Sequence, residues 1–153
     1  MAHNPVNHPL RPLYRTLGFL AGAYLVVFGV VGLINSGDLE FTGLNSGSVF
    51  GLGSSILWSI ISIILGAIIV IAVVIGRNLD ITVEKYLGWA IIVVGCYELA
   101  TSRTDANLFG FTIGTVIVTY IVGLVLILAS LYGKVVPSEQ AGAPRQVREG
   151  RTA

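Results

Sequence analysis

The sequence predicts an all-α membrane protein in which four antiparallel transmembrane helices form one bundle. Composition is the first observation behind this prediction: 54% of the 153 residues are hydrophobic and 11% are charged, against about 25% charged residues in a soluble domain. The second observation is that the few charges leave uncharged stretches long enough for a helix to cross a bilayer. The third is that basic residues gather in alternate connecting segments, as in multipass membrane proteins.

Four helical spans are predicted from the positions of the charges. The first covers about 15–35, and the second covers about 54–76, which holds the densest run of isoleucine and valine. The third, about 84–102, is interrupted by Glu98, and the fourth covers about 112–133. A helix rises about 1.5 Å per residue, so about 20 residues cross about 30 Å of hydrocarbon. Open strands are excluded, because unpaired backbone groups are costly in lipid.

Polar segments flank the predicted transmembrane domain, which covers 14–134. Residues 1–13 are expected to form a cytoplasmic segment, with no helix until after Pro12. Residues 135–153 are expected to form a disordered cytoplasmic tail, because they are polar and rich in glycine and charge. Eight basic residues lie at or beyond the span ends on one side, whereas the other two loops hold only Arg103; the eight are Arg11, Arg15, Arg77, Lys85, Lys134, Arg145, Arg148 and Arg151. Both termini are therefore predicted to be cytoplasmic.

An internal repeat relates the second and fourth spans. Phe50-Gly51-Leu52 precedes the second span and Phe109-Gly110-Phe111 precedes the fourth. A shift of 57 residues then aligns four pairs, Ile56 with Ile113, Ser62 with Thr119, Gly66 with Gly123 and Ala72 with Ala129. The pattern is that of two tandem hairpins in one orientation, but such matches also arise by chance in sequences rich in Ile, Val and Leu.

A distinctive run, His8-Pro9-Leu10-Arg11-Pro12-Leu13-Tyr14-Arg15, leads into Leu17-Gly18-Phe19-Leu20-Ala21-Gly22-Ala23-Tyr24. With the Phe-Gly leads into spans two and four, it resembles a family of small actinobacterial integral membrane proteins defined as a domain of unknown function. The resemblance extends to about Gly133. It implies a four-helix protein of the cytoplasmic membrane of a mycobacterium-like bacterium, and no activity. Family members often carry Asn-x-x-His early in spans two and four; this sequence has hydroxyl residues there, so no functional residue is carried over.

Glu98 is the residue most indicative of a site, because a carboxylate inside hydrocarbon is costly unless it is paired, protonated or in contact with water. Tyr120 of the antiparallel fourth span should lie at a similar depth, which predicts a hydrogen bond between Glu98 and Tyr120. Thr119 is expected close by, and Arg103 is a candidate counter-ion. Three roles stay open for Glu98: holding the bundle together, coupling transport to a proton or ion, and contacting a partner subunit.

Small residues form two stripes, with Gly18, Gly22, Gly29 and Gly32 on the first span, and Gly110 and Gly114 at the start of the fourth. Glycine lets helix backbones approach closely, which favours packing in lipid. Each stripe can pack inside this bundle or against another chain. The sequence alone leaves both alternatives open.

Other side chains are expected to be structural. The apolar, glycine-rich loop 36–53 should lie on the membrane surface or cap the bundle. Aromatic rings should anchor the membrane interfaces: at the outer one Phe50, Trp58, Phe109 and Phe111, and at the cytoplasmic one Tyr14, Tyr86, Trp89 and Tyr132. Tyr24 should hydrogen-bond one of the hydroxyls of Ser59, Ser62 and Thr115. Cys96 should be buried as a small apolar residue.

The leading interpretation is a non-enzymatic structural or accessory protein that assembles with itself or a larger membrane complex through its glycine-rich faces. An enzyme is disfavoured, because no nucleophile–base set is present and no histidine follows His8; no cofactor, metal or nucleic acid is expected either. The alternative is a small transporter or channel component that uses Glu98 as a coupling carboxylate. Such a protein should line one cavity with the hydroxyls of Ser54, Ser55, Ser59, Ser62, Thr115, Thr119 and Tyr120.

Overall fold

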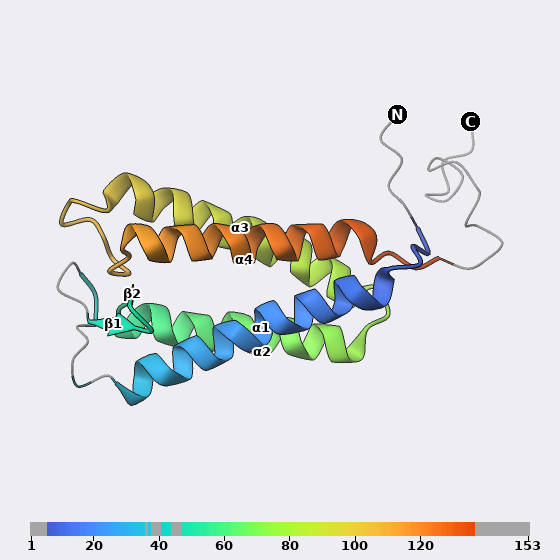
Figure 1. The fold of residues 1–153 in the computed structure, drawn as a ribbon, viewed down its shortest axis with the longest axis horizontal. Helices are drawn as coiled ribbons and strands as arrows, with labels where there is room; N and C mark the ends of the chain where they lie inside the picture. Colours follow the sequence, from blue (N-terminus) through green and yellow to red (C-terminus); the bar gives the residue numbers. More distant parts are fainter. Residues whose placement is uncertain (1–5, 36, 38–40, 44–46, 137–153) are drawn as a thin grey trace.

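The computed structural model describes residues 6–35, 37, 41–43 and 47–136. It contains α1 (Arg11–Ile34), a hairpin of β1 (Ser48–Val49) and β2 (Leu52–Gly53), α2 (Ile56–Ile75), α3 (Leu79–Thr101) and α4 (Ile113–Tyr132). The helices lie side by side as one elongated bundle (Figure 1). The predicted all-α bundle of four helices is confirmed at this level.

Three of the helices in the described part of the chain, α1, α2 and α4, are long and apolar enough to cross a membrane. This agrees with a membrane protein. α3 is as long, with 23 residues, but it carries four charged side chains, Asp80, Glu84, Lys85 and Glu98. α3 therefore differs from the other three helices in its charged residues and not in its length.

Two helices begin earlier than the sequence predicted. α1 starts at Arg11 rather than after Pro12, because a proline in the first turn of a helix gives up an N–H that would have no partner there. α3 starts at Leu79 rather than near residue 84. The prediction had left Asp80 and Glu84 in or beside a loop, whereas both are helical and buried. The other helix ends lie within two residues of the predicted bounds.

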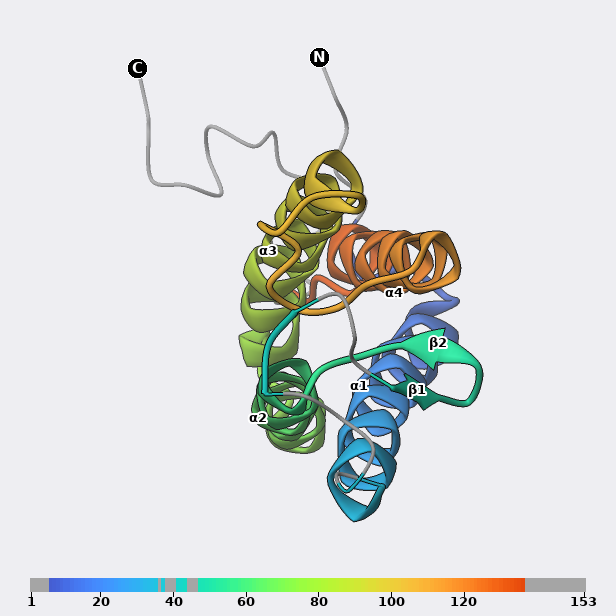
Figure 2. The ribbon, with the colours of Figure 1, turned by 90° about the vertical axis from the view of Figure 1, so that its left-hand side faces the viewer.

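The bundle consists of two closely packed helix pairs, α1 with α2 and α3 with α4, which Figure 2 shows end-on. In each pair a glycine permits close approach. A Cβ atom at Gly66 would lie 2.5 Å from the carbonyl oxygen of Gly22, and Cβ atoms at Gly88 and Gly123 would each lie 3.0 Å from the other residue's carbonyl oxygen. Gly66 and Gly123 are aligned by the repeat, which supports its interpretation as two tandem hairpins.

The first and last residues of α2 and α4 match at the same shift of 57 residues as the repeat. The two helices have 20 residues each and begin at Ile56 and Ile113, so a shift of 57 residues superimposes their ranges. The residues before them, Ser55 and Thr112, each accept a backbone hydrogen bond from the third residue of the helix. A side-chain oxygen at this position satisfies an N–H that has no partner within the helix.

One end of the bundle, here called the terminal end, holds the first and last described residues, Val6 and Val136, and the turn between α2 and α3 (Figure 1). Asn7 bonds the backbone of Val136 through both atoms of its amide, and Asn78 bonds Val135 in the same way. The chain is thus tied together where the basic segments were predicted to meet. The expected disordered tail lies, beyond Val136, outside the described residues.

The opposite end, here called the hairpin end, is closed by the β-hairpin. Phe50 and Gly51 turn the chain with φ values of 53° and 77°, as a two-residue hairpin turn requires. Val49 is fully buried in a cluster with Phe28, Trp58, Phe111 and Val116. The described part of loop 36–53 therefore caps the bundle. Trp58 and Phe111 belong to this core, so the prediction that they anchor a membrane interface is wrong.

Candidate functional site

A charged cluster lies inside the terminal end of the bundle. Asp80 and Glu84, one helical turn apart on α3, are 1% and 2% exposed. Arg15 of α1 forms an ion pair with Asp80, with 3.4 Å between Arg15 Nε and Asp80 Oδ2. The Arg15 guanidinium also donates to the carbonyl of Val73 on α2. Arg15 therefore links three helices through one side chain.

Glu84 occupies space that Gly18 leaves open. A Cβ atom at position 18 would overlap Glu84 Oε1, so the carboxyl group lies directly against the α1 backbone. Among the described residues, Glu84 Oε1 and Asp80 Oδ1 have no hydrogen-bond partner. The sequence analysis missed this cluster because it placed Asp80 in a loop and Glu84 at the very start of the third span. The available signal was their spacing of four, which puts them on one helix face.

Glu98 is fully buried near the hairpin end. Its Oε1 accepts a hydrogen bond of 3.3 Å from the backbone N–H of Phe109, in the segment that connects α3 to α4. Asn107 holds the same segment, because its side chain bonds both the N–H and the carbonyl of Phe111. Within the described residues Glu98 Oε2 has no partner. The observed contact of Glu98 thus fixes a connecting segment to the bundle.

The predicted companions of Glu98 lie elsewhere. The Tyr120 hydroxyl donates to Cys96 Sγ at 3.5 Å rather than to Glu98, and Arg103 is exposed. Cys96 is exposed too, so the expectation of a buried thiol is wrong. Thr119 is buried against Gly95 of α3. The structure therefore does not bring Glu98, Tyr120 and Arg103 together as one polar site.

The glycine stripe of α1 faces into the bundle. A Cβ atom at Gly22 would meet Ile69, one at Gly29 would overlap the Ser59 carbonyl oxygen, and one at Gly32 would overlap the Ser59 hydroxyl. The stripe is therefore buried in contacts within the chain. The second predicted pair does not form a helical face, since Gly110 lies before α4 with φ 68° and a Cβ at Gly114 would make only ordinary contacts.

Four serines just before α2 and in its first two turns lie inside the bundle. Ser54, Ser55, Ser59 and Ser62 are all fully buried. Ser55 caps α2, and the Ser59 hydroxyl donates to the Ser55 carbonyl at 3.0 Å. Thr115 of α4 donates to the carbonyl of Gly53 in the hairpin at 2.9 Å. The hydroxyls of Ser54, Ser55, Ser59 and Thr115 thus bond nearby backbone groups, whereas Ser62 Oγ has no hydrogen-bond partner among the described residues.

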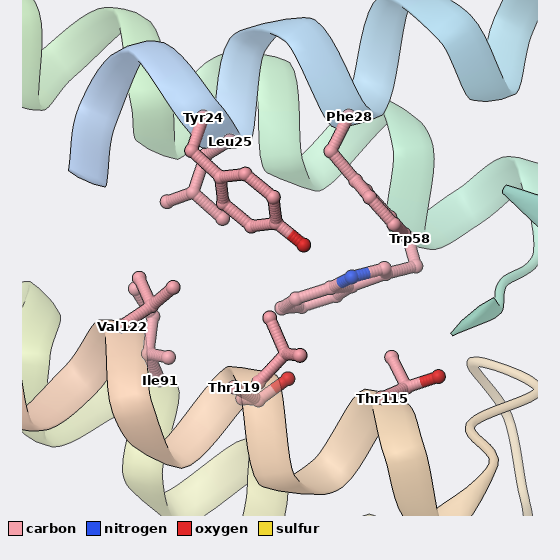
Figure 3. A pocket seen from close by; sticks show the side chains of 9 residues that line it. Tyr24, Leu25, Phe28, Trp58, Ile91, Thr115, Thr119 and Val122 are labelled. Atoms are coloured by element: carbon pink, nitrogen blue, oxygen red, sulfur yellow. The ribbon is translucent and has the colours of Figure 1, made fainter. Parts of the chain in front are cut away.

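A small cavity lies between the helix pairs. Its volume is about 10 Å³, which is about the space of one water molecule. Tyr24 and Phe28 of α1 and Trp58 of α2 face Thr119 and Thr115 of α4 across it (Figure 3). The Tyr24 hydroxyl points into this space and makes no hydrogen bond to Ser59, Ser62 or Thr115, contrary to the prediction.

Comparison with known proteins found no match to the chain. No protein-family model matches the chain, and neither a curated protein nor a solved structure matches it. The resemblance to an actinobacterial family therefore stays a prediction from the sequence. Within the described residues, no group of three or more His, Cys, Asp or Glu side chains could hold a metal ion.

Proposed function

We propose that the chain is a non-enzymatic accessory protein of a bacterial cytoplasmic membrane, with both termini on the cytoplasmic side. In this proposal it acts by contacting another membrane protein or a second copy of itself. The single observation that carries the proposal is the closed interior. Gly22, Gly29 and Gly32 of α1 pack against α2, two of them against Ser59, instead of lining a solute path, and the described interior keeps a cavity of about 10 Å³.

α3 crosses the membrane with the other helices in this proposal. It packs along α4 from Gly133, near Ile81, to Tyr120, near Gly95. Three of its four charged residues, Asp80, Glu84 and Glu98, are buried in the bundle and would not face lipid. Removing these charges from the lipid-facing surface lowers the cost of placing them at membrane depth.

The glycine stripe on α1 is not available for assembly, so the contact surface must be another one. The exposed face of α3 differs from that of α2. Large aliphatic side chains cover the α2 face, namely Ile60, Ile64, Ile68, Ile71, Val74 and Ile75. The exposed side of α3 also carries aliphatic Val93 and Leu99, but it adds three aromatic rings and the thiol, from Tyr86, Trp89, Tyr97 and Cys96. Aromatic residues are enriched in protein interfaces, which supports the α3 face as the partner surface.

Extraction of the tagged protein from its native membrane into nanodiscs, followed by mass spectrometry, tests this proposal. The expected result is a second protein, or a second copy, recovered at a fixed ratio. Trp89→Ala should lower that recovery, whereas Ile64→Ala on the α2 face should leave it unchanged. Recovery of the chain as a partner-free monomer would contradict the proposal.

A small transporter component is the second candidate, and one observation favours it. Asp80, Glu84 and Glu98 each bury a carboxylate oxygen that has no hydrogen-bond partner among the described residues. Buried carboxyl groups of this kind form proton relays in transporters. Purified protein in proteoliposomes with a pH-sensitive dye tests the idea. A proton flux that Glu98→Gln abolishes would favour transport, and a flux equal to that of empty vesicles would exclude it for protons.

A further inference from the structure

We infer that an open groove at the terminal end binds the phosphate of an anionic phospholipid. The groove has a volume of about 390 Å³ and lies between the start of α1 and the end of α2. Its lining includes Arg11, Arg15, Thr16, Phe19, Val73 and Val74. The inference rests on the membrane insertion assumed in the proposed function, but it does not depend on any protein partner.

The lining changes from charged to apolar along α1. Arg11, Arg15 and Phe19 are spaced by four residues, so they share one helix face. Phe19 lies about 12 Å further along the axis than Arg11, at about 1.5 Å per residue, in the direction away from the terminal end. Phe19 and Val74 are exposed, at 40% and 70%. A phospholipid has the same order, with its phosphate outside and its acyl chains within the hydrocarbon.

The two arginines are held in place by the protein itself. Arg15 is fixed by the Val73 carbonyl and by Asp80. The Nε atom of Arg11 donates to the carbonyl of Gly133 at 3.0 Å, while its two terminal nitrogens bond none of the described residues. Guanidinium groups match phosphate with paired N–H donors. Arg11 therefore presents free donors to the groove, with Arg15 behind it.

Arg11 offers more uncompensated positive charge to a bound anion than Arg15 does. Asp80 faces Arg15 at 3.4 Å and offsets much of its charge, and Glu84 lies in the same cluster. The described residues place no carboxylate within ion-pair distance of Arg11. Arg11 should thus supply most of the attraction for an anion, and it can be changed without leaving Asp80 unpaired.

Native mass spectrometry of the purified full-length chain tests the inference. The protein is released from micelles that contain equal amounts of phosphatidylglycerol and phosphatidylcholine with identical acyl chains. The expected result is one retained phosphatidylglycerol in preference to phosphatidylcholine. Arg11→Gln should lower this preference about fivefold, which is the effect of removing one favourable basic contact with an anionic lipid. Arg77→Gln, which removes an exposed arginine outside the groove, should not lower it.

A second variant guards against a folding defect, because Arg11 also contacts Gly133. Val74→Trp fills the groove without changing charge and should likewise lower lipid retention. Equal loss with Arg77→Gln and Arg11→Gln would overturn the site in favour of a diffuse basic surface. Equal retention of the two lipids would overturn phosphate recognition. If inorganic phosphate displaced the lipid at similar concentration, the groove would be a site for free phosphate and the lipid assignment would fail.

Discussion

Gly18 of α1 and Glu84 of α3 are in direct contact, and the carboxyl group of Glu84 fills the space where a side chain at position 18 would begin. A glycine usually assigned to packing between backbones here accommodates a buried acid. The contact joins the first helix pair to the second beside Arg15 and Asp80. It therefore accounts for the space that the Glu84 side chain occupies inside the bundle.

Gly18→Ala should destabilise the protein by about 1–3 kcal/mol, as expected when a methyl group is forced into a packed site. Glu84→Ala removes the group that the methyl would overlap, so the double variant should lose less stability than the sum of the single ones. Denaturant unfolding of all three variants in detergent measures this coupling. Strict additivity of the two effects would show that positions 18 and 84 are not in contact.

Gly66→Ala should weaken the packing of α1 on α2, because its Cβ would lie 2.5 Å from a backbone oxygen that cannot move alone. The expected loss is again about 1–3 kcal/mol. Gly114→Ala provides the matched control, since a Cβ there meets its nearest neighbour at 3.4 Å. Thermal unfolding in one detergent compares the two. Equal midpoints would show that α1 and α2 are not closely packed at Gly66.

Three of the spans were predictable from sequence, because a helix that crosses the bilayer needs about 20 apolar residues and these segments are long, apolar and uncharged. The position of Asp80 and Glu84 was not, because it depends on the space left by Gly18 and on Arg15, which are distant in sequence. Trp58 fitted a membrane interface by its place at a span end. Its burial follows from the β-hairpin, whose turn at Phe50 and Gly51 the sequence did not identify.

Arg15 and Asp80 should be more sensitive to single than to paired substitution. Asp80→Leu leaves the guanidinium of Arg15 without its ion-pair partner, and the expected loss is about 1–3 kcal/mol. This is less than for a fully buried pair, because the Arg15 side chain is 34% exposed. The double variant Arg15→Met, Asp80→Leu should recover part of the loss. Free energies of unfolding of the two single variants and the double variant test this. A loss in the double variant equal to the sum of the losses in Arg15→Met and Asp80→Leu would contradict it.

Glu98 should act through its hydrogen bond to Phe109. Glu98→Gln keeps an acceptor oxygen and should preserve the fold, whereas Glu98→Leu should cost about 1–3 kcal/mol by leaving the partly buried N–H of Phe109 unpaired. Hydrogen exchange at the Phe109 amide is the direct readout. Exchange should accelerate in Glu98→Leu and stay slow in Glu98→Gln. Unchanged protection in Glu98→Leu would show that the bond does not hold the connecting segment.

Cys96 gives the most direct test of the accessory role, because it is the only cysteine of the chain and it is exposed on α3. A thiol-directed photocrosslinker attached there in native membranes samples the proposed partner surface. A matched probe sits on α2 in the variant Cys96→Ala, Ile68→Cys. The accessory role predicts one discrete protein adduct from position 96 and only lipid adducts from position 68. Lipid adducts alone from both positions would contradict the accessory role.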